Sequence, residues 1–289
     1  MKNEKRKMKL VCLPYAGGSA MMYGKWKGKL DHDIEICQLE LPGRGLRFKD
    51  KNANSMEELT EDLAQRLSVL VGDSDYVLLG FCYGAIVSYS LYQYIWKNQV
   101  CNMPKGMILI SSLSPGFHSK AERLFEMSNA KIAKMLLGVF SFNPWKASED
   151  EMDILKTMLE IVNPQVAEEL RKTPLWKLVI QFLFPKLGKR NYCQDVLRIM
   201  KEDGKIMYGY NGEKEKIPFM QPVLAIHGKQ DNVVSRNDME KWKEFCNDEF
   251  YLKEVSGGHL MLFDEDDTFL ELIENTVRDF FNYKKERRA

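Results

Sequence analysis

Six short runs of apolar residues recur along the chain, and each of them predicts a β-strand. Between the second and third runs, leucines recur at helical spacing behind Ser55-Met-Glu-Glu58, which has the form of a capping box. Similar patterns predict helices after the third run, at 236–246 and, with an amphipathic face, at 268–281. Strands that alternate with helices favour a parallel α/β sheet. The six runs are 10–14, 34–39, 75–79, 106–112, 222–228 and 250–255.

The alternation of strands and helices stops between residues 118 and 210. This segment is rich in large apolar residues in helix-like patterns, and prolines at 144, 164, 174 and 185 divide it into short helices. Such a block either covers a site as a lid or packs on the sheet as a subdomain. Its place between the fourth and fifth strands favours the lid. We therefore predict one domain over 1–289 with a helical lid inserted at 118–210.

Charge and composition argue against several classes of function. The formal net charge is +1, so no electrostatic feature favours nucleic acid as a partner. No run approaches the ~18 apolar residues of a membrane span, and the first run is too short for a signal peptide. The six cysteines include no C-x-x-C pair, which favours reduced thiols over disulfides and metal sites. We expect a cytoplasmic monomer without membrane or nucleic-acid binding.

The third apolar run leads into Gly80-Phe-Cys-Tyr-Gly84, and residues compatible with a helix follow. This strand, turn and helix form the context of the G-x-S-x-G nucleophile elbow, in which glycines allow the close approach of strand and helix. Cys82 occupies the nucleophile position. A thiol attacks as its thiolate, which a helix N-terminus and a neighbouring histidine both favour. Cys82 is therefore the candidate nucleophile, and its base must come from elsewhere.

His259 is the candidate base. It follows two glycines just after the last predicted strand, and catalytic groups of open α/β sheets collect at the carboxyl ends of the strands. His227 lies inside an apolar run and is typical of a core histidine. His32 and His118 lie in polar loops without a pattern.

Asp231 is the candidate orienting acid, because it follows the fifth predicted strand at the same edge of the sheet. The chain order Cys82, Asp231, His259 is the nucleophile, acid, histidine order of α/β-hydrolases. Asp264 and Asp266 are closer to the histidine in sequence, but they precede the terminal helix and are better placed to cap it.

Two backbone N–H groups are candidates for an oxyanion hole. One belongs to Tyr83, the residue after the nucleophile, and the other to the Gly-rich loop Tyr15-Ala-Gly-Gly18 after the first strand. We expect Ala16 to donate from this loop, with Tyr15 as the neighbouring possibility. The alternative is that the loop is an ordinary Gly-rich turn.

These motifs together resemble the type II thioesterases of nonribosomal peptide and polyketide synthesis. The resemblance implies an α/β-hydrolase that removes acyl groups from the phosphopantetheine arm of carrier proteins. It also implies a catalytic Cys82, Asp231 and His259, oxyanion donors at Ala16 and Tyr83, and no metal or bound cofactor. The motifs are 13–19, 39–45, 80–85, 222–231 and 257–259.

Two departures from this family matter for function. Its members usually carry histidine and serine where this chain has Phe81 and Cys82, and the helical block is longer than the usual lid. An acyl-cysteine is a good donor to amines and thiols, so acyl transfer to an amine or a second carrier protein is the alternative to hydrolysis. A non-catalytic carrier-binding protein, or a serine replaced by cysteine, also fits the pattern. Arg44 and Arg47 either meet acidic carrier helices or are solvated.

Overall fold

The computed structural model describes residues 7–116, 190–212, 214–247, 249–263 and 266–283, with side chains of the helix at 190–209 from residue 198 onward. The chain forms two compact units, residues 1–122 with 206–289 and residues 123–205. The first unit carries the whole sheet and every predicted site residue. Its architecture is the one that positions the candidate chemistry.

Six parallel strands form one sheet in the order β2-β1-β3-β4-β5-β6. The predicted strands and the parallel sheet are therefore confirmed. Because all strands run in the same direction, all of their carboxyl ends meet at one edge. The strand order reverses between β1 and β3, and the loops at such a switch point leave a crevice in which ligands bind. The strands are β1 Met8–Leu13, β2 Ile34–Gln38, β3 Tyr76–Phe81, β4 Gly106–Ile110, β5 Val223–Gly228 and β6 Phe250–Val255.

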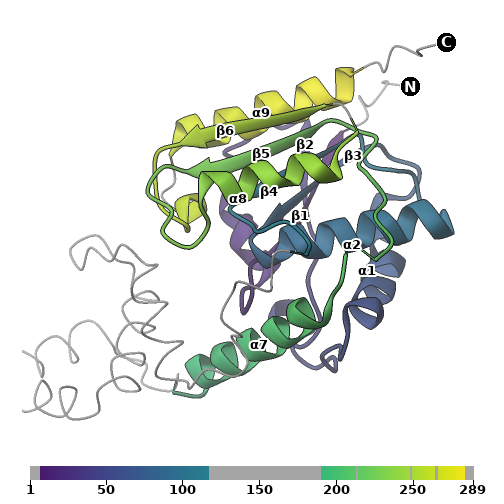
Figure 1. Ribbon diagram of the computed structural model, residues 1–289, viewed down its shortest axis with the longest axis vertical. Coiled ribbons are helices and arrows are strands. Elements are labelled where there is room, and N and C mark those ends of the chain that lie inside the picture. The colour runs from purple at the N-terminus through teal and green to yellow at the C-terminus, as the bar shows by residue number, and fades with distance from the viewer. Residues whose placement is uncertain (1–6, 117–189, 213, 248, 264–265, 284–289) are drawn as a thin grey trace, which may run out of the picture. The chain divides into compact units, whose positions relative to one another are not determined.

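Helices cover both faces of this sheet (Figure 1). Helix α2 (Tyr83–Asn98) packs against β1, β3 and β4, and α1 (Met56–Val71) packs on α2. On the other face, α9 (Asp267–Asn282) contacts the same three strands. Its buried Ile273 and Val277 belong to one core cluster with Leu79 and Phe81 of β3. The strand β3, which leads to Cys82, therefore packs against α2 on one face and α9 on the other.

Shorter elements connect this framework at the carboxyl edge of the sheet. The 3-10 helix η1 follows β1, η2 follows β2, and η6 follows β6. The helix predicted at 236–246 is divided into α8, with a Ser235 capping box, and the 3-10 helix η5. Their bounds are η1 Ala20–Trp26, η2 Gly45–Arg47, α8 Arg236–Glu240, η5 Lys241–Phe245 and η6 Met261–Phe263.

Helix caps agree in part with the sequence pattern. Ser55 caps α1 by accepting a hydrogen bond from the N–H of Glu58 at 3.2 Å, as predicted. The Glu58 carboxylate accepts instead from the N–H of Asn54 at 2.8 Å, one residue before the cap. Asp266 caps α9 through the N–H of Thr268 at 2.9 Å, which confirms its predicted role, whereas Asp264 lies outside the described residues.

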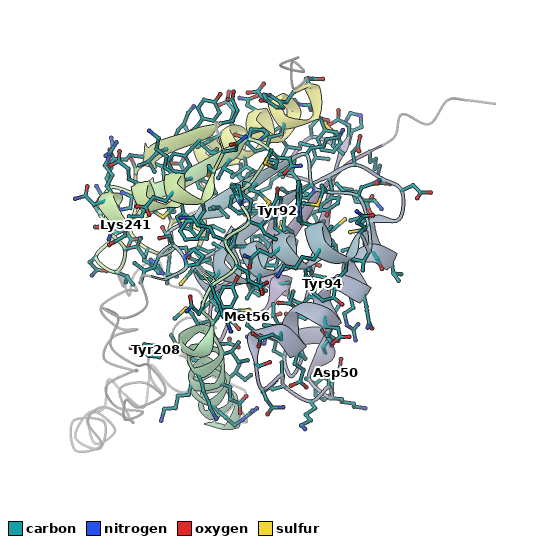
Figure 2. All side chains as sticks on the ribbon, turned by 45° about the vertical axis from the view of Figure 1, so that its right-hand side comes forward. Asp50, Met56, Tyr92, Tyr94, Tyr208 and Lys241 are labelled. Atoms are coloured by element: carbon teal, nitrogen blue, oxygen red, sulfur yellow. The ribbon has the colours of Figure 1, made fainter. Side chains whose placement is uncertain are left out.

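The predicted lid at 118–210 falls mostly outside the described residues, so its role and boundaries stay predictions. Its described end is helix α7 (Arg190–Gly209). Tyr92 of α2, labelled in Figure 2, hydrogen-bonds to the segment that leads to β5. Its hydroxyl donates to Gln221 Oε1 and accepts from the N–H of Met220, both at 2.9 Å. The chain that returns to the sheet is thereby tied to the helix that begins after Cys82.

Within the described ranges, no helix has the length and apolar character needed to span a bilayer.

Candidate active site

Cys82 lies in a strained turn between β3 and α2. Its φ of 53° is in the left-handed region, which costs a non-glycine residue about 1–2 kcal/mol. Two backbone hydrogen bonds fix the turn. The N–H of Cys82 donates to Ile110 O at 2.8 Å, and the N–H of Ala85 donates to Cys82 O at 3.1 Å. The predicted elbow geometry is therefore present, with the thiol at the N-cap of α2.

Both glycines of the elbow are required by close backbone contacts. A Cβ on Gly80 would lie 2.4 Å from the carbonyl oxygen of Gly84, where β3 and α2 pass each other. A Cβ on Gly84 would lie 2.5 Å from Leu13 O, at the end of β1. No side chain fits at either position, so the spacing of the motif follows from the crowding of three backbone segments.

His259 and Asp231 are in direct contact. His259 Nδ1 donates to Asp231 Oδ2 at 2.9 Å. The Asp231 side chain is fully buried, and its other oxygen accepts from the N–H groups of Val233 and Val234 at 2.8 and 3.0 Å. Burial by itself raises the pKa of Asp231, but the hydrogen bonds and the charge of His259 outweigh it and lower that pKa. The carboxylate is therefore kept ionised and aimed at the imidazole.

His259 also hydrogen-bonds to Cys82. Burial lowers the pKa of His259, but the negative charge of the Cys82 thiolate and the bond to Asp231 outweigh burial and raise the pKa to about 10. An imidazolium beside a thiolate is the arrangement that activates cysteine nucleophiles. Since Nδ1 is bound to Asp231, Nε2 is the nitrogen left to face the thiol.

A row of three aromatic rings begins at the histidine. Phe81 lies 5.6 Å from the His259 ring, Tyr15 lies 5.6 Å from Phe81, and Phe263 lies 6.0 Å from Tyr15, measured between ring centroids. Phe81 is thus a packing partner of the imidazole. His259 is buried, and its removal from water strengthens its electrostatic interactions.

The two predicted oxyanion donors belong to the loop after β1 and to the first residue of α2. Ala16 is buried in the Tyr15–Ser19 loop, which a hydrogen bond from the N–H of Gly18 to Tyr15 O closes at 2.9 Å. In the part of the chain that the structure describes, the N–H of Ala16 donates to no protein group. Tyr83 is the first residue of α2, at the positive end of the helix dipole.

Sequence reasoning missed the carboxylate that holds this loop. Glu40 is buried behind it and accepts hydrogen bonds from Ser19 Oγ and, at 2.9 Å, from the N–H of Ala20. Nothing in the local pattern marked Glu40, because a lone acid after a strand is ordinarily solvated. The only available signal was its place in the Leu39–Gly45 motif.

The predictions for Arg44 and Arg47 were wrong, because both side chains are buried and neither is free to meet a partner at the surface. Arg47 forms a two-pronged ion pair with Asp62 at 2.6 and 2.8 Å. Arg44 donates to the carbonyl oxygen of Pro42 at 3.3 Å. Through these contacts both arginines stabilise the segment that follows β2.

The other histidines lie apart from this site or outside the described residues. His227 is buried, as predicted, and its Nε2 donates to Val234 O at 2.9 Å. It thereby supports the turn whose N–H groups bind Asp231. His32 is exposed beside Asp31, and His118 lies outside the described residues.

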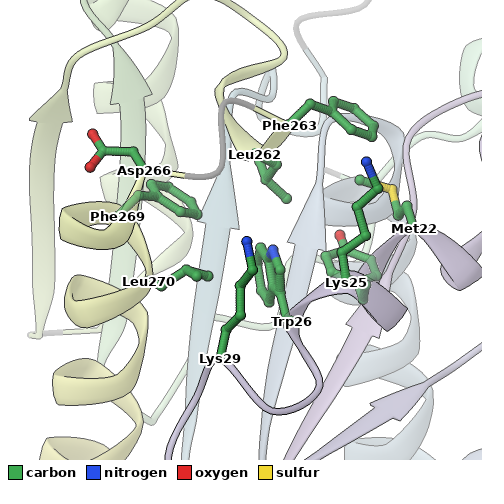
Figure 3. Close-up of a pocket in the computed structure, with 10 residues that line it drawn as sticks. Met22, Lys25, Trp26, Lys29, Leu262, Phe263, Asp266, Phe269 and Leu270 are labelled. Atoms are coloured by element: carbon green, nitrogen blue, oxygen red, sulfur yellow. The ribbon is translucent and has the colours of Figure 1, made fainter. Parts of the chain in front are cut away.

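A separate pocket lies between η1 and the start of α9 (Figure 3). Trp26, Leu262 and Phe269 give it an apolar floor, and Lys25 and Lys29 stand at its rim. None of the predicted catalytic residues lines it. One of its lining residues, Phe263, packs its ring on Tyr15.

Comparison with known proteins agrees with this architecture. The model of the thioesterase domain family matches residues 8–173, which is more than half of the chain, and that of the alpha/beta hydrolase fold matches residues 160–266. The gramicidin S biosynthesis protein GrsT of Aneurinibacillus migulanus is 26% identical, over 96% of this chain and 91% of its own. The probable anguibactin biosynthesis thioesterase AngT of Vibrio anguillarum is 25% identical, over 91% and 89%.

The fold is shared with solved structures as well. The crystal structure of ClbQ from the colibactin NRPS/PKS pathway superposes with a TM-score of 0.72 at 19% identity, over 96% of this chain and 99% of that protein. The parallel sheet, the elbow turn and the family match together decide the class of protein. The chain belongs to the thioesterase family and is a thioester hydrolase with the α/β-hydrolase fold.

Proposed function

We propose that this protein hydrolyses acyl groups from the phosphopantetheine arm of carrier proteins, through an acyl-enzyme on Cys82. The observation that carries the proposal is the position of His259, which bonds to Asp231 on one side and to Cys82 on the other. In this proposal Cys82 is the nucleophile, His259 the proton carrier and Asp231 the orienting acid. The hydrolysis would serve to edit or release acyl groups during nonribosomal peptide or polyketide synthesis.

Acylation begins with attack of the Cys82 thiolate on the thioester carbonyl carbon. A new carbon–sulfur bond forms, and the carbonyl oxygen becomes an oxyanion that the N–H groups of Ala16 and Tyr83 stabilise. Collapse of this intermediate breaks the bond to the arm sulfur. The imidazolium of His259 gives its Nε2 proton to the departing thiolate, which leaves as the free thiol of the arm.

In deacylation His259 acts first as a base, whereas in acylation it acts as an acid. Once Cys82 is acylated it carries no charge, so the pKa of His259 loses the contribution of the thiolate and falls. The neutral imidazole then takes a proton from water, which attacks the acyl carbonyl. The Cys82–acyl bond breaks, and a carboxylic acid is released. Asp231 stabilises the imidazolium that forms.

The carrier-bound substrate is supported by the names of related proteins. GrsT and AngT are described by gramicidin S and anguibactin biosynthesis, and ClbQ by an NRPS/PKS pathway. In such systems acyl groups are carried on phosphopantetheine. The proposed chemistry uses the protein's own side chains, and the arm belongs to the substrate, so no separate cofactor is required.

Acyl transfer is the second candidate function, and the nucleophile itself favours it. Attack of a thiolate on a thioester exchanges one thioester for another, so the first step is close to neutral in energy and reversible. The Cys82 acyl-enzyme could therefore pass its acyl group to an amine or to a second carrier protein. The outcome depends on whether water or another acceptor reaches the acyl-enzyme.

Intact-mass measurement with an acyl-loaded carrier protein tests the proposal. We expect an adduct on Cys82 that decays to free acid in buffer alone, and no adduct on the variant Cys82→Ala. An adduct that persists until an amine or a second carrier is added would identify the protein as a transferase. If Cys82→Ala hydrolyses the substrate as fast as the parent, the proposed acyl-enzyme mechanism is wrong.

A further inference from the structure

An exposed apolar patch lies beside the loop that carries Ala16. Met21 of η1, Leu46 of η2 and Phe48 just after it have 52%, 78% and 68% of their surface exposed. The elements η1 and η2 contact each other, so Met21 and Leu46 stand on neighbouring elements, and Phe48 directly follows η2. Large apolar side chains that gather on a surface commonly mark a site of protein contact. We refer to Met21, Leu46 and Phe48 as the η2 patch.

The η2 patch stands on a buried polar scaffold. Arg47, between its two most exposed residues, is buried and donates to Asp62 at 2.6 and 2.8 Å and to Glu40 O at 3.0 Å. The inward position of this side chain fixes the backbone on either side of it, with Leu46 and Phe48 left exposed. A surface that is ordered before binding loses little conformational entropy when a partner docks.

The charge next to the patch is positive. Lys49 and Lys51 are exposed, and in the described ranges neither has a carboxylate within ion-pair distance. Lys49 lies over the ring of Phe48, 5.6 Å from its centroid. The carboxylate between the two lysines, Asp50, is already bound by Arg47 at 2.8 Å and by Arg66 at 3.2 Å. The surface therefore fits a partner that offers acidic groups around an apolar contact.

The patch is also joined to the candidate active site. Arg44 Nη1 donates to Gly18 O at 3.5 Å, and a Cβ on Gly45 would lie 2.5 Å from Ser19 Oγ. The loop after β2 thus packs directly on the Tyr15–Ser19 loop. Both loops leave the carboxyl edge of the sheet, as Cys82 does. A partner seated on the η2 patch is therefore next to the loop with the candidate oxyanion donor.

We propose that the η2 patch, with Lys49 and Lys51 at its rim, is the surface on which an acidic carrier-protein domain docks to deliver its acyl-phosphopantetheine arm. This inference rests on the proposed function and names the place where its substrate is recognised. The apolar side chains supply contact area, and the lysines attract and orient the acidic domain. The arm then extends over the Tyr15–Ser19 loop to Cys82.

Two thioester substrates with the same acyl group separate docking from chemistry. One is acetyl-phosphopantetheine on a purified peptidyl carrier domain, and the other is acetyl-N-acetylcysteamine, which has no protein part. For Leu46→Asp and for the pair Lys49→Glu and Lys51→Glu, we expect kcat/KM with the carrier to fall about tenfold or more. With the small thioester it should stay within about twofold of the parent, because the changes are on the surface. The matched control is Val69→Asp, an 86% exposed valine on α1.

Titration of the protein with the same carrier domain measures binding independently of hydrolysis. We expect the parent and Val69→Asp to bind the carrier and the η2 patch variants to bind it at least about tenfold more weakly. Equal binding by parent and patch variants would overturn the proposal, and so would a parallel loss with both thioesters. If the parent hydrolyses neither thioester, the proposed function is wrong, and the titration still decides whether this surface docks a carrier.

Discussion

Asp231 Oδ2 lies 2.9 Å from Nδ1 of His259, although the two residues are 28 positions apart in the chain. The contact forms because β5 and β6 are parallel neighbours, so that the loops after them leave the same edge of the sheet. The bond fixes which imidazole nitrogen faces Cys82. Several measurable properties depend on this one relationship.

Replacement of Asp231 by asparagine is expected to abolish most of the activity. The amide side chain of Asp231→Asn would keep the shape of the acid but hold the imidazole in the wrong tautomer, and kcat should fall roughly 10³-fold or more. The measurement is kcat with a small thioester. Asp266→Asn is the matched control, because an asparagine still caps α9 and the activity should stay close to that of the parent.

The same carboxylate should make stability depend on acid pH. The pKa of Asp231 is lowered in the folded state, so the ionised group stabilises the fold above the unfolded value of 3.8, and this contribution is lost as the pH falls through the native pKa. Urea unfolding at several pH values should therefore show a gap between the parent and Asp231→Asn at neutral pH that closes in acid. A constant gap would mean that the ionisation of Asp231 does not stabilise the fold.

Titration of His259 should depend on Cys82. The thiolate is one of the causes that raise the pKa of His259 to about 10, so its removal in Cys82→Ala should lower that pKa. We expect the imidazole of the parent to stay protonated through neutral pH and to lose its proton near pH 10. NMR titration of the ring in both proteins measures this. An identical pKa in the two proteins would show that thiol and imidazole do not form a charge pair.

Glu40 is expected to act as a positioning residue for the oxyanion loop. Glu40→Gln removes one of the two acceptors for Ser19 and Ala20, which should cost about 1–3 kcal/mol of stability. Because Ala16 would move with the loop, kcat for a small thioester should fall about tenfold with little change in KM. The control is Glu35→Gln, an exposed residue of β2. A loss of stability with unchanged kcat would limit Glu40 to a structural role.

Replacement of an elbow glycine by alanine, which adds only one carbon atom, should destabilise the protein. Gly84→Ala would place a Cβ 2.5 Å from Leu13 O, and we expect it to destabilise the protein by about 3 kcal/mol or more, since backbone atoms cannot rotate away. Gly209→Ala, at the end of α7, would place its added carbon within 4 Å of no atom outside the adjacent residues and the helix backbone, and it should be neutral or stabilising. Thermal unfolding compares the two. Equal melting temperatures would show that the strand and helix can separate at the elbow.

The strands, the elbow and the identity of the residues that meet could all be predicted from local sequence patterns. Apolar runs predict strands because a parallel sheet is buried on both faces, and Gly80, Cys82 and Gly84 predict a sharp turn because only glycines tolerate such close backbones. His259 and Asp231 could be selected because both follow strands whose carboxyl ends share one edge. Each of these inferences needs only local pattern and the direction of the strands.

Which charged side chains near the site are buried could be seen only in the folded protein. Glu40, Arg44 and Arg47 resemble solvated loop residues in the sequence, yet all three are buried because η1, η2 and α1 enclose them, whereas the apolar Leu46 is exposed. Burial depends on which distant segments pack together, and no local pattern encodes that. The strain at Cys82 and the contact between His259 and Asp231 are likewise properties of the assembled sheet.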